Sequence, residues 1–152
     1  MPLPAADGVV SALDHAYADV TAMVADLDDN DLLLPSGCRG WSIADLLYHM
    51  LQDAQRALVA FATPADGHIA TLVTEAVIHH FDLIASRPDA PAPAPAAMAI
   101  AVSTMEGLAA PGGLPAHWDA RAILLKGSGR AELDDTDRRA LGSSAALLPR
   151  LS

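Results

Sequence analysis

Apolar residues recur along this chain with the spacing of α-helices rather than of strands. In residues 8–27 the apolar positions include Val9, Leu13, Val20 and Met23, which fall three, four or seven residues apart. This is the 3.6-residue period of a helix with one buried face. Three further long helices are predicted in the same way, at about 42–62, 68–86 and 96–109. We therefore expect an all-α fold built on four main helices.

Segments rich in Pro and Gly separate these predicted helices. Residues 32–41 read L-L-L-P-S-G-C-R-G-W, which predicts a loop. The turn sequence T-P-A-D-G at 63–67 is short, so the helices on either side of it should form an antiparallel hairpin. The Pro-rich stretch at 88–95 predicts an extended connector long enough to run the length of a bundle.

The C-terminal part of the chain is predicted to be a smaller helical extension. A short helix at about 117–126 ends at G-S-G, and a last helical turn or two stops at Gly142. We expect a single domain over residues 1–152, with a four-helix bundle over 8–110 and a short helical tail over 111–152.

Polar side chains gather on one face of each helix of the predicted hairpin. On the first helix this face carries Asp45, His49, Gln52, Asp53 and Arg56. On the second it carries His68, Thr71, Glu75, His79, Asp82 and Ser86. Such faces usually point to water, but two facing polar arcs can also line a shared cleft. Both interpretations are open at this point.

The register of the hairpin favours a shared site. His49 lies 16 residues before Ala65 and His79 lies 14 residues after it, so the two positions differ in height by roughly 3 Å. Glu75 is one helical turn from His79 on the same face. Two imidazoles and a carboxylate are a common ligand set for zinc and other divalent first-row metals, and three protein ligands leave a position open. The spacing E-x-x-x-H with one remote His is nevertheless a weak motif by itself.

Several nearby residues have two interpretations each. Asp45 could orient His49 from one turn away or cap its helix, and Asp82 could orient His79 or lie exposed. Cys38 could be a reactive thiol, but the sequence places only Arg39 beside it as a cation, which favours a structural role. Trp41 is expected to pack the loop against the bundle, with stacking on a substrate as the alternative.

The remaining basic residues of interest lie in the tail. These residues are Arg121, Lys126 and Arg130. We expect them to be solvated surface charges, with binding of an anionic thiol or acid as the alternative.

Composition and charge narrow the classes of partner. The 152 residues are 52% hydrophobic and carry a formal net charge of −10, and the nine Lys and Arg form no run. This disfavours binding to nucleic acid or to anionic membranes. One cysteine allows no disulfide within the chain, and no secretory leader or long apolar span is recognisable. We expect a cytoplasmic protein that binds a small molecule.

Two segments resemble a known family. Residues 32–50, L-L-L-P-S-G-C-R-G-W-S-I-A-D-L-L-Y-H-M, and residues 73–83, V-T-E-A-V-I-H-H-F-D-L, are similar to the two signatures of the mycothiol-dependent maleylpyruvate isomerase family. The resemblance implies a DinB-like four-helix bundle. It also implies a divalent metal, zinc being the first candidate, bound by His49, Glu75 and His79. Mycothiol or a similar thiol is the implied cosubstrate.

The chain also departs from that family's pattern. Only 25 residues separate His49 from Glu75, where family members usually carry a longer segment, and the tail is too short to be the larger C-terminal domain of the isomerase. Part of a substrate pocket could therefore come from a second subunit, so a homodimer is a candidate assembly.

The sequence thus leaves three functions to be compared. The first is a metal-dependent, thiol-using transferase or isomerase of the maleylpyruvate isomerase type that acts on a small electrophile. The second is a non-catalytic DinB-like bundle that serves as a dimerising or ligand-binding module. The third is a metal-dependent hydrolase in which Asp45 or Asp53 acts as base on a bound water.

Overall fold

The computed structural model of the chain describes residues 6–61, 66–87, 89–109 and 112–149. The described residues form six α-helices and two short 3-10 helices, which confirms the all-α fold class. In chain order the elements are α1 Ala6–Ala25, η1 Asp31–Leu33, α2 Ile43–Phe61, α3 Asp66–Ile84, α4 Pro95–Leu108, α5 Ala120–Gly127, α6 Asp135–Leu141 and η2 Gly142–Leu147.

The long helices begin and end close to the predicted residues. The expected turn at 63–67 lies largely outside the described residues, as does the last residue of the helix predicted at 42–62. The helix expected to begin at 117 begins at Ala120 instead, because the carboxylate of Asp119 caps it by accepting from the amide of Ala122 at 2.7 Å. The two 3-10 helices η1 and η2 were not predicted, since such short elements leave no periodic pattern.

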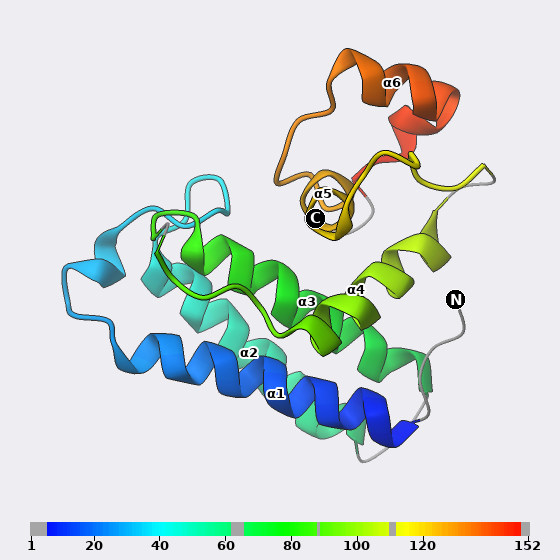
Figure 1. Cartoon of the computed structure of the whole chain (residues 1–152). Helices are drawn as coiled ribbons and strands as arrows, with labels where there is room; N and C mark the ends of the chain where they lie inside the picture. The colour runs from blue at the N-terminus through cyan, green and yellow to red at the C-terminus, as the bar shows by residue number, and fades with distance from the viewer. Residues whose placement is uncertain (1–5, 62–65, 88, 110–111, 150–152) are drawn as a thin grey trace.

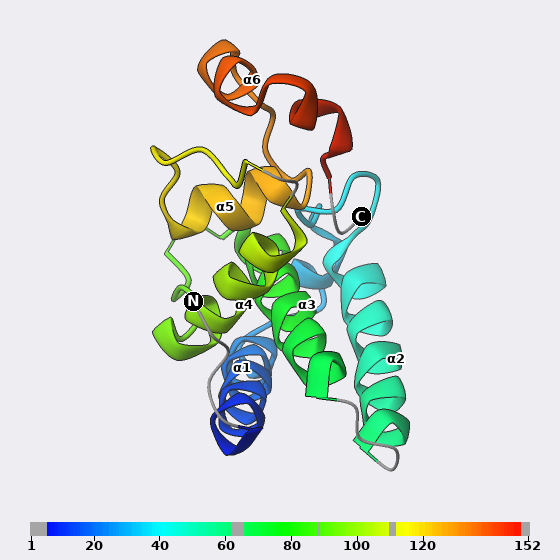
Figure 2. The same cartoon turned by 90° about the vertical axis from the view of Figure 1, so that its right-hand side faces the viewer.

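Helix α3 lies at the centre of the fold and packs against α1, α2 and α4 (Figures 1 and 2). Every residue from Ala76 to Leu83 is buried, so this part of α3 is covered on all sides. The interpretation in which the polar face of this helix points to water is therefore wrong for His79 and Asp82. Among the described residues, no helix combines the length and the apolar character needed to cross a membrane.

The apolar core is divided into two clusters that share α3. The larger cluster joins α1, α3, α4 and the C-terminal elements, and includes Val77 and Leu124. The smaller cluster joins the C-terminal half of α1 to α2, through Val20, Ile43 and Leu46. Because the two clusters hold α2 and the C-terminal elements against different sides of α3, the polar residues of α3 are enclosed between them.

Two polar contacts attach the Pro-rich connector to the bundle. Nε2 of His80 lies 2.9 Å from the carbonyl oxygen of Pro91. The amide of Ala94 donates to the carboxylate of Asp19 at 3.0 Å. His80 therefore helps to hold the connector against α3.

The C-terminal extension lies at one end of the long helices, where α5 packs against α4 (Figure 2). The guanidinium of Arg121 lies over the ring of Phe81, 4.7 Å from its centroid, and so joins α5 to α3. Nζ of Lys126 pairs with the buried carboxylate of Asp137. The prediction of a solvated surface charge is confirmed for Arg121, which is exposed, and is wrong for Lys126, whose side chain is only 19% exposed.

The buried carboxylate of Asp137 holds the C-terminal extension together. It accepts from Nε1 of Trp118, lies 2.9 Å from Nε2 of His117, and accepts from the amide of Asp134 at 3.0 Å, in addition to its pair with Lys126. Burial alone would raise the pKa of Asp137, but these donors outweigh it and hold the pKa well below its usual range.

We expect Asp137→Asn to lower the free energy of unfolding by about 2 kcal/mol, because it removes the charge that Lys126 faces. The folded-state pKa lies below the unfolded value, so this stabilisation is present above about pH 4 and is lost as the pH falls further. Urea unfolding between pH 3 and pH 7 should show a smaller acid-induced loss of stability in the variant. Asp135→Asn, at an exposed position on the same helix, is the control. Equal losses in the two variants would contradict this role.

Candidate metal centre

A cavity of about 780 Å³ opens between α2, α3, the loop that precedes α2 and the C-terminal extension. Its lining includes His49 and Asp53 from α2, and Glu75 and His79 from α3. Arg130, which follows α5, closes part of its wall. The polar faces of the two hairpin helices therefore line a shared cleft, the second of the two arrangements that the sequence allows.

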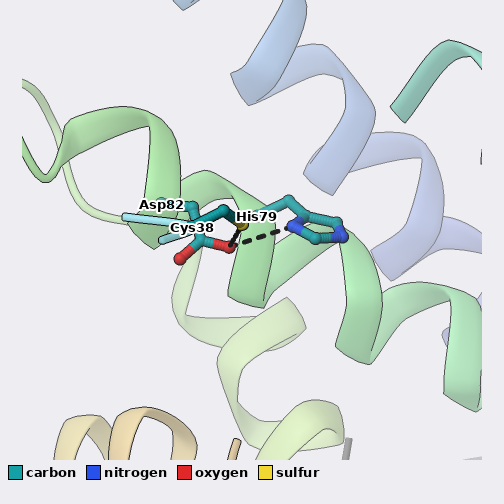
Figure 3. A group of neighbouring side chains, drawn as sticks. All are labelled: Cys38, His79 and Asp82. Carbon is teal, nitrogen blue, oxygen red and sulfur yellow. Dashed lines mark hydrogen bonds and ion pairs between the residues drawn. The ribbon is translucent and has the colours of Figure 1, made fainter. Parts of the chain in front are cut away.

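The imidazole of His79 is oriented by Asp82. Nδ1 of His79 lies 3.0 Å from Oδ2 of Asp82, and both side chains are almost completely buried. A carboxylate accepts hydrogen bonds, so in the neutral imidazole Nδ1 carries the proton and Nε2 keeps its lone pair. Figure 3 shows Nε2 on the side of the ring away from Asp82.

Nε2 of His79 is buried and has no hydrogen bond. In the part of the chain that the structure describes, it is the one buried side-chain nitrogen or oxygen without such a partner. Its nearest charged neighbour is Oε2 of Glu75, at 3.7 Å. A buried polar atom left unpaired costs about 1–3 kcal/mol, and a ring nitrogen with a free lone pair is the form that binds metals.

His49 brings a second imidazole to the same place. Its ring centroid lies 5.0 Å from that of His79, and the two rings are nearly perpendicular. The indole of Trp41 also lies against His49, with ring centroids 5.4 Å apart. The structure thus brings together the two histidines that the hairpin register pairs, with Glu75 one turn from His79.

Asp53 is a further donor that the sequence analysis did not include among the ligands. Its Oδ2 lies 3.1 Å from Nε2 of His49, and the donor atoms of His49, Asp53 and His79 all lie within 4.8 Å of one another. Donors around a tetrahedral zinc are roughly 3.4 Å apart, so small side-chain rotations would suffice. The position of Asp53 one turn after His49 was the signal that could have identified it.

These donors fit a divalent first-row metal. Two imidazoles and the carboxylate of Asp53 present donor atoms within 4.8 Å of one another, whereas the predicted ligand Glu75 lies 3.7 Å from His79 but outside that group. Nε2 of His79, which has no hydrogen bond, lies on the side of the ring away from Asp82 (Figure 3). His49, Glu75, Asp53 and His79 are the residues that could hold such an ion.

The carboxylate of Asp82 is shared by three residues that come from different parts of the chain. Besides His79, it accepts from Sγ of Cys38 at 3.1 Å and from Nη2 of Arg130 at 3.2 Å. Figure 3 shows Cys38 and His79 meeting at the same Asp82 oxygen. We call Cys38, His79, Asp82 and Arg130 the Asp82 network. Arg130, expected as a solvated charge, is largely buried here, so that prediction is wrong.

Burial alone would raise the pKa of Asp82. The hydrogen bond from His79, the charge of Arg130 and the hydrogen bond from Cys38 act in the opposite direction and hold this pKa below its ordinary value. Asp82 is therefore an anion that accepts hydrogen bonds at neutral pH.

Asp45, the other residue expected to orient a histidine, does not contact His49. Its carboxylate accepts from the amide of Ser42 at 2.9 Å and from the Ser42 hydroxyl at 2.7 Å, which lowers its pKa. Asp45 thus caps the start of α2, the second of its two predicted roles. The carboxylate beside His49 is that of Asp53, which lies one turn after His49 on α2.

The loop that carries Cys38 is fixed to α3 through Gly37. The amide of Gly37 donates to the backbone carbonyl of Asp82 at 2.7 Å. A Cβ at position 37 would lie 2.6 Å from Oδ1 and 2.8 Å from Cα of Asp82. Only glycine therefore allows this loop to lie against the helix.

We expect Gly37→Ala to lower the free energy of unfolding by about 1–3 kcal/mol, since the loop must move away from the backbone of α3. Gly107→Ala is the matched control, because a Cβ there meets nothing within 4 Å and should stabilise α4 slightly. Thermal unfolding followed by circular dichroism measures both variants. A Gly37→Ala protein as stable as the wild type would show that the close approach is not required.

Cys38 is a hydrogen-bond donor rather than a nucleophile in this setting. Burial, and then its hydrogen bond to the anionic Asp82, raise the pKa of the Cys38 thiol to about 11. The thiolate is therefore scarce near neutral pH, which agrees with the structural role that the sequence favours.

Alkylation of this single cysteine by iodoacetamide tests that conclusion. At pH 8 the folded protein should react at least about tenfold more slowly than the urea-unfolded chain, and the rate in the folded protein should still rise with pH up to about 11. The extent of labelling is measured by mass spectrometry. Equal or faster labelling of the folded protein would mean that Cys38 is an activated thiol.

Comparison with known protein families assigns this chain to one of them. The family model described as the mycothiol maleylpyruvate isomerase N-terminal domain matches residues 13–123, which is more than half of the chain. Comparison with curated proteins and with solved structures finds no match. The matched segment contains both histidines and both acidic residues that line the cavity. The chain therefore belongs to the mycothiol maleylpyruvate isomerase N-terminal domain family.

Proposed function

We propose that this protein is a metal-dependent enzyme that joins a low-molecular-weight thiol, such as mycothiol, to a small electrophile. The unpaired Nε2 of His79 is the observation that carries the proposal, because it is buried, oriented by Asp82 and directed away from that carboxylate. The family description, which names mycothiol and an isomerase, supports the choice of thiol.

In this proposal His49, Glu75 and His79 hold the ion, and zinc is the first candidate. A divalent metal bound there would lower the pKa of a bound thiol and so supply the nucleophile at neutral pH. The remaining steps belong to the side chains of the cavity. Oδ2 of Asp53 accepts the thiol proton, and the sulfur then bonds to a carbon atom of the electrophile. In a substitution the carbon–halogen bond breaks and halide leaves with the electron pair; in an addition the double bond opens and its neighbouring carbon takes the proton back from Asp53.

The dimensions and lining of the cavity suit two small molecules. Its volume of about 780 Å³ lies within the range of small-molecule sites. Trp41 is 40% exposed and presents an aromatic surface beside His49. A flat or apolar electrophile could stack there, beside the residues that would hold the metal and its thiol.

A metal-dependent hydrolase is the second candidate. The 3.1 Å approach of Asp53 to His49 places a carboxylate where it could also take a proton from a bound water. Activity without any thiol would favour this function. If the purified protein binds neither metal nor thiol, a non-catalytic bundle that dimerises or binds a ligand is the remaining candidate function.

Metal content and thiol-dependent turnover test the proposal together. Protein purified without added metal should contain about one divalent ion per chain, and with mycothiol it should consume chlorodinitrobenzene. His79→Ala should lose the metal, and its rate of chlorodinitrobenzene consumption should fall at least about 100-fold, because the substitution removes the oriented lone pair. His15→Ala, at an exposed site on α1, is the control and should keep both.

A chelator should also lower the melting temperature of the wild-type protein but not that of His79→Ala, since only the former loses a bound ligand. The proposal would be contradicted by wild-type protein that binds no divalent metal at micromolar concentration, or by equal turnover in wild type and His79→Ala.

A further inference from the structure

The turn after α5 places one arginine against the candidate metal centre. Gly129 has a φ of 78°, a left-handed conformation that favours glycine, and the amide of Arg130 then donates to the carbonyl of Leu125 at 2.7 Å. Nη1 of Arg130 donates to the carbonyl of Ser128 at 3.0 Å. The G-S-G-R sequence therefore fixes both the backbone and the direction of this side chain.

From this position Arg130 reaches both oxygens of Asp82. Its Nη2 lies 3.2 Å from Oδ2 and its Nε lies 3.4 Å from Oδ1, so the planar guanidinium meets the planar carboxylate at two points. Nη2 also lies 3.8 Å from Sγ of Cys38. A lysine could not make this two-point contact.

Asp82 needs such a partner because its side chain is only 1% exposed. A buried carboxylate without a cation beside it is strongly disfavoured, and Arg130 is the cation that the described residues place in contact with it. The same carboxylate holds Nδ1 of His79. The orientation of the His79 ring is thereby linked to a residue 51 positions further along the chain.

We propose that Arg130 is a positioning residue of the metal centre: by holding the Asp82 carboxylate at two points, it keeps Nε2 of His79 free and directed into the site. Arg130 lies beyond residues 13–123, the segment matched by the family model. The C-terminal extension is then part of the site as well as part of the fold. The inference rests on one part of the proposed function, namely that His79 is a ligand of the metal.

The tautomer of His79 tests the inference without any metal. In chelator-treated wild-type protein, long-range ¹H–¹⁵N correlation spectra should show His79 protonated at Nδ1 alone, with the signal assigned by comparison with His79→Gln. Arg130→Gln should give a mixture of the Nδ1–H and Nε2–H forms. Arg139→Gln, which removes an exposed arginine of α6, is the matched control and should leave the spectrum unchanged.

Metal affinity gives a second readout. Competition with a chromophoric chelator should show zinc binding weakened by at least about tenfold in Arg130→Gln and unchanged in Arg139→Gln. If Arg130 acts through Asp82, the same substitution in an Asp82→Asn background should change the affinity by less than about twofold. Circular dichroism verifies that each variant is folded. Where Arg130→Gln is too unstable, Arg130→Lys, which keeps only the charge, replaces it.

An Arg130→Gln protein with the wild-type His79 tautomer would overturn the inference, as would equal losses of affinity in the wild-type and Asp82→Asn backgrounds. Wild-type protein that binds no metal would instead overturn the proposed function, and the spectra of the metal-free protein would still decide the role of Arg130.

Discussion

A hydrogen bond of 3.0 Å joins Nδ1 of His79 to the carboxylate of Asp82 within α3. It fixes which ring nitrogen of the neutral imidazole carries the proton, and so leaves the lone pair on Nε2, the nitrogen beside Glu75. Without it the two imidazoles could be close together and still present a proton where a lone pair is needed. The chemistry proposed for the cavity depends on this contact more than on the proximity of the histidines.

The contact places an anion in the core, and much of the structure near it serves to stabilise that anion. Cys38 donates to Asp82 from the loop before α2, and Arg130 donates from the turn after α5. Gly37 has no side chain, so the loop can reach the backbone of α3. Segments that are far apart in the sequence are thus brought together around one carboxylate, and they hold the candidate site and the end of the bundle in place at the same time.

The sequence predicted the parts of this arrangement that depend on local periodicity. Helix spacing located α1 to α4, and the register of the hairpin paired His49 with His79. It did not predict the burial of Asp82 or the contact with Arg130, because a helical wheel of α3 cannot show that other elements cover its polar face. Asp45 and Asp53 lie on the same face of α2, about two turns apart with His49 between them. Only the structure could show that Asp45 bonds to Ser42 and that Asp53 contacts His49.

X-ray absorption at the zinc edge of the loaded protein tests the central claim most directly. Two imidazole nitrogens and carboxylate oxygen at about 2.0–2.2 Å, with no sulfur in the first coordination sphere, are the expected result before thiol is added, and a Zn–S distance of about 2.3 Å should appear with mycothiol. A sulfur ligand in the absence of added thiol would place the metal on Cys38 and contradict the account. A spectrum with fewer than two imidazoles would also contradict it, since His79 would then not be a ligand.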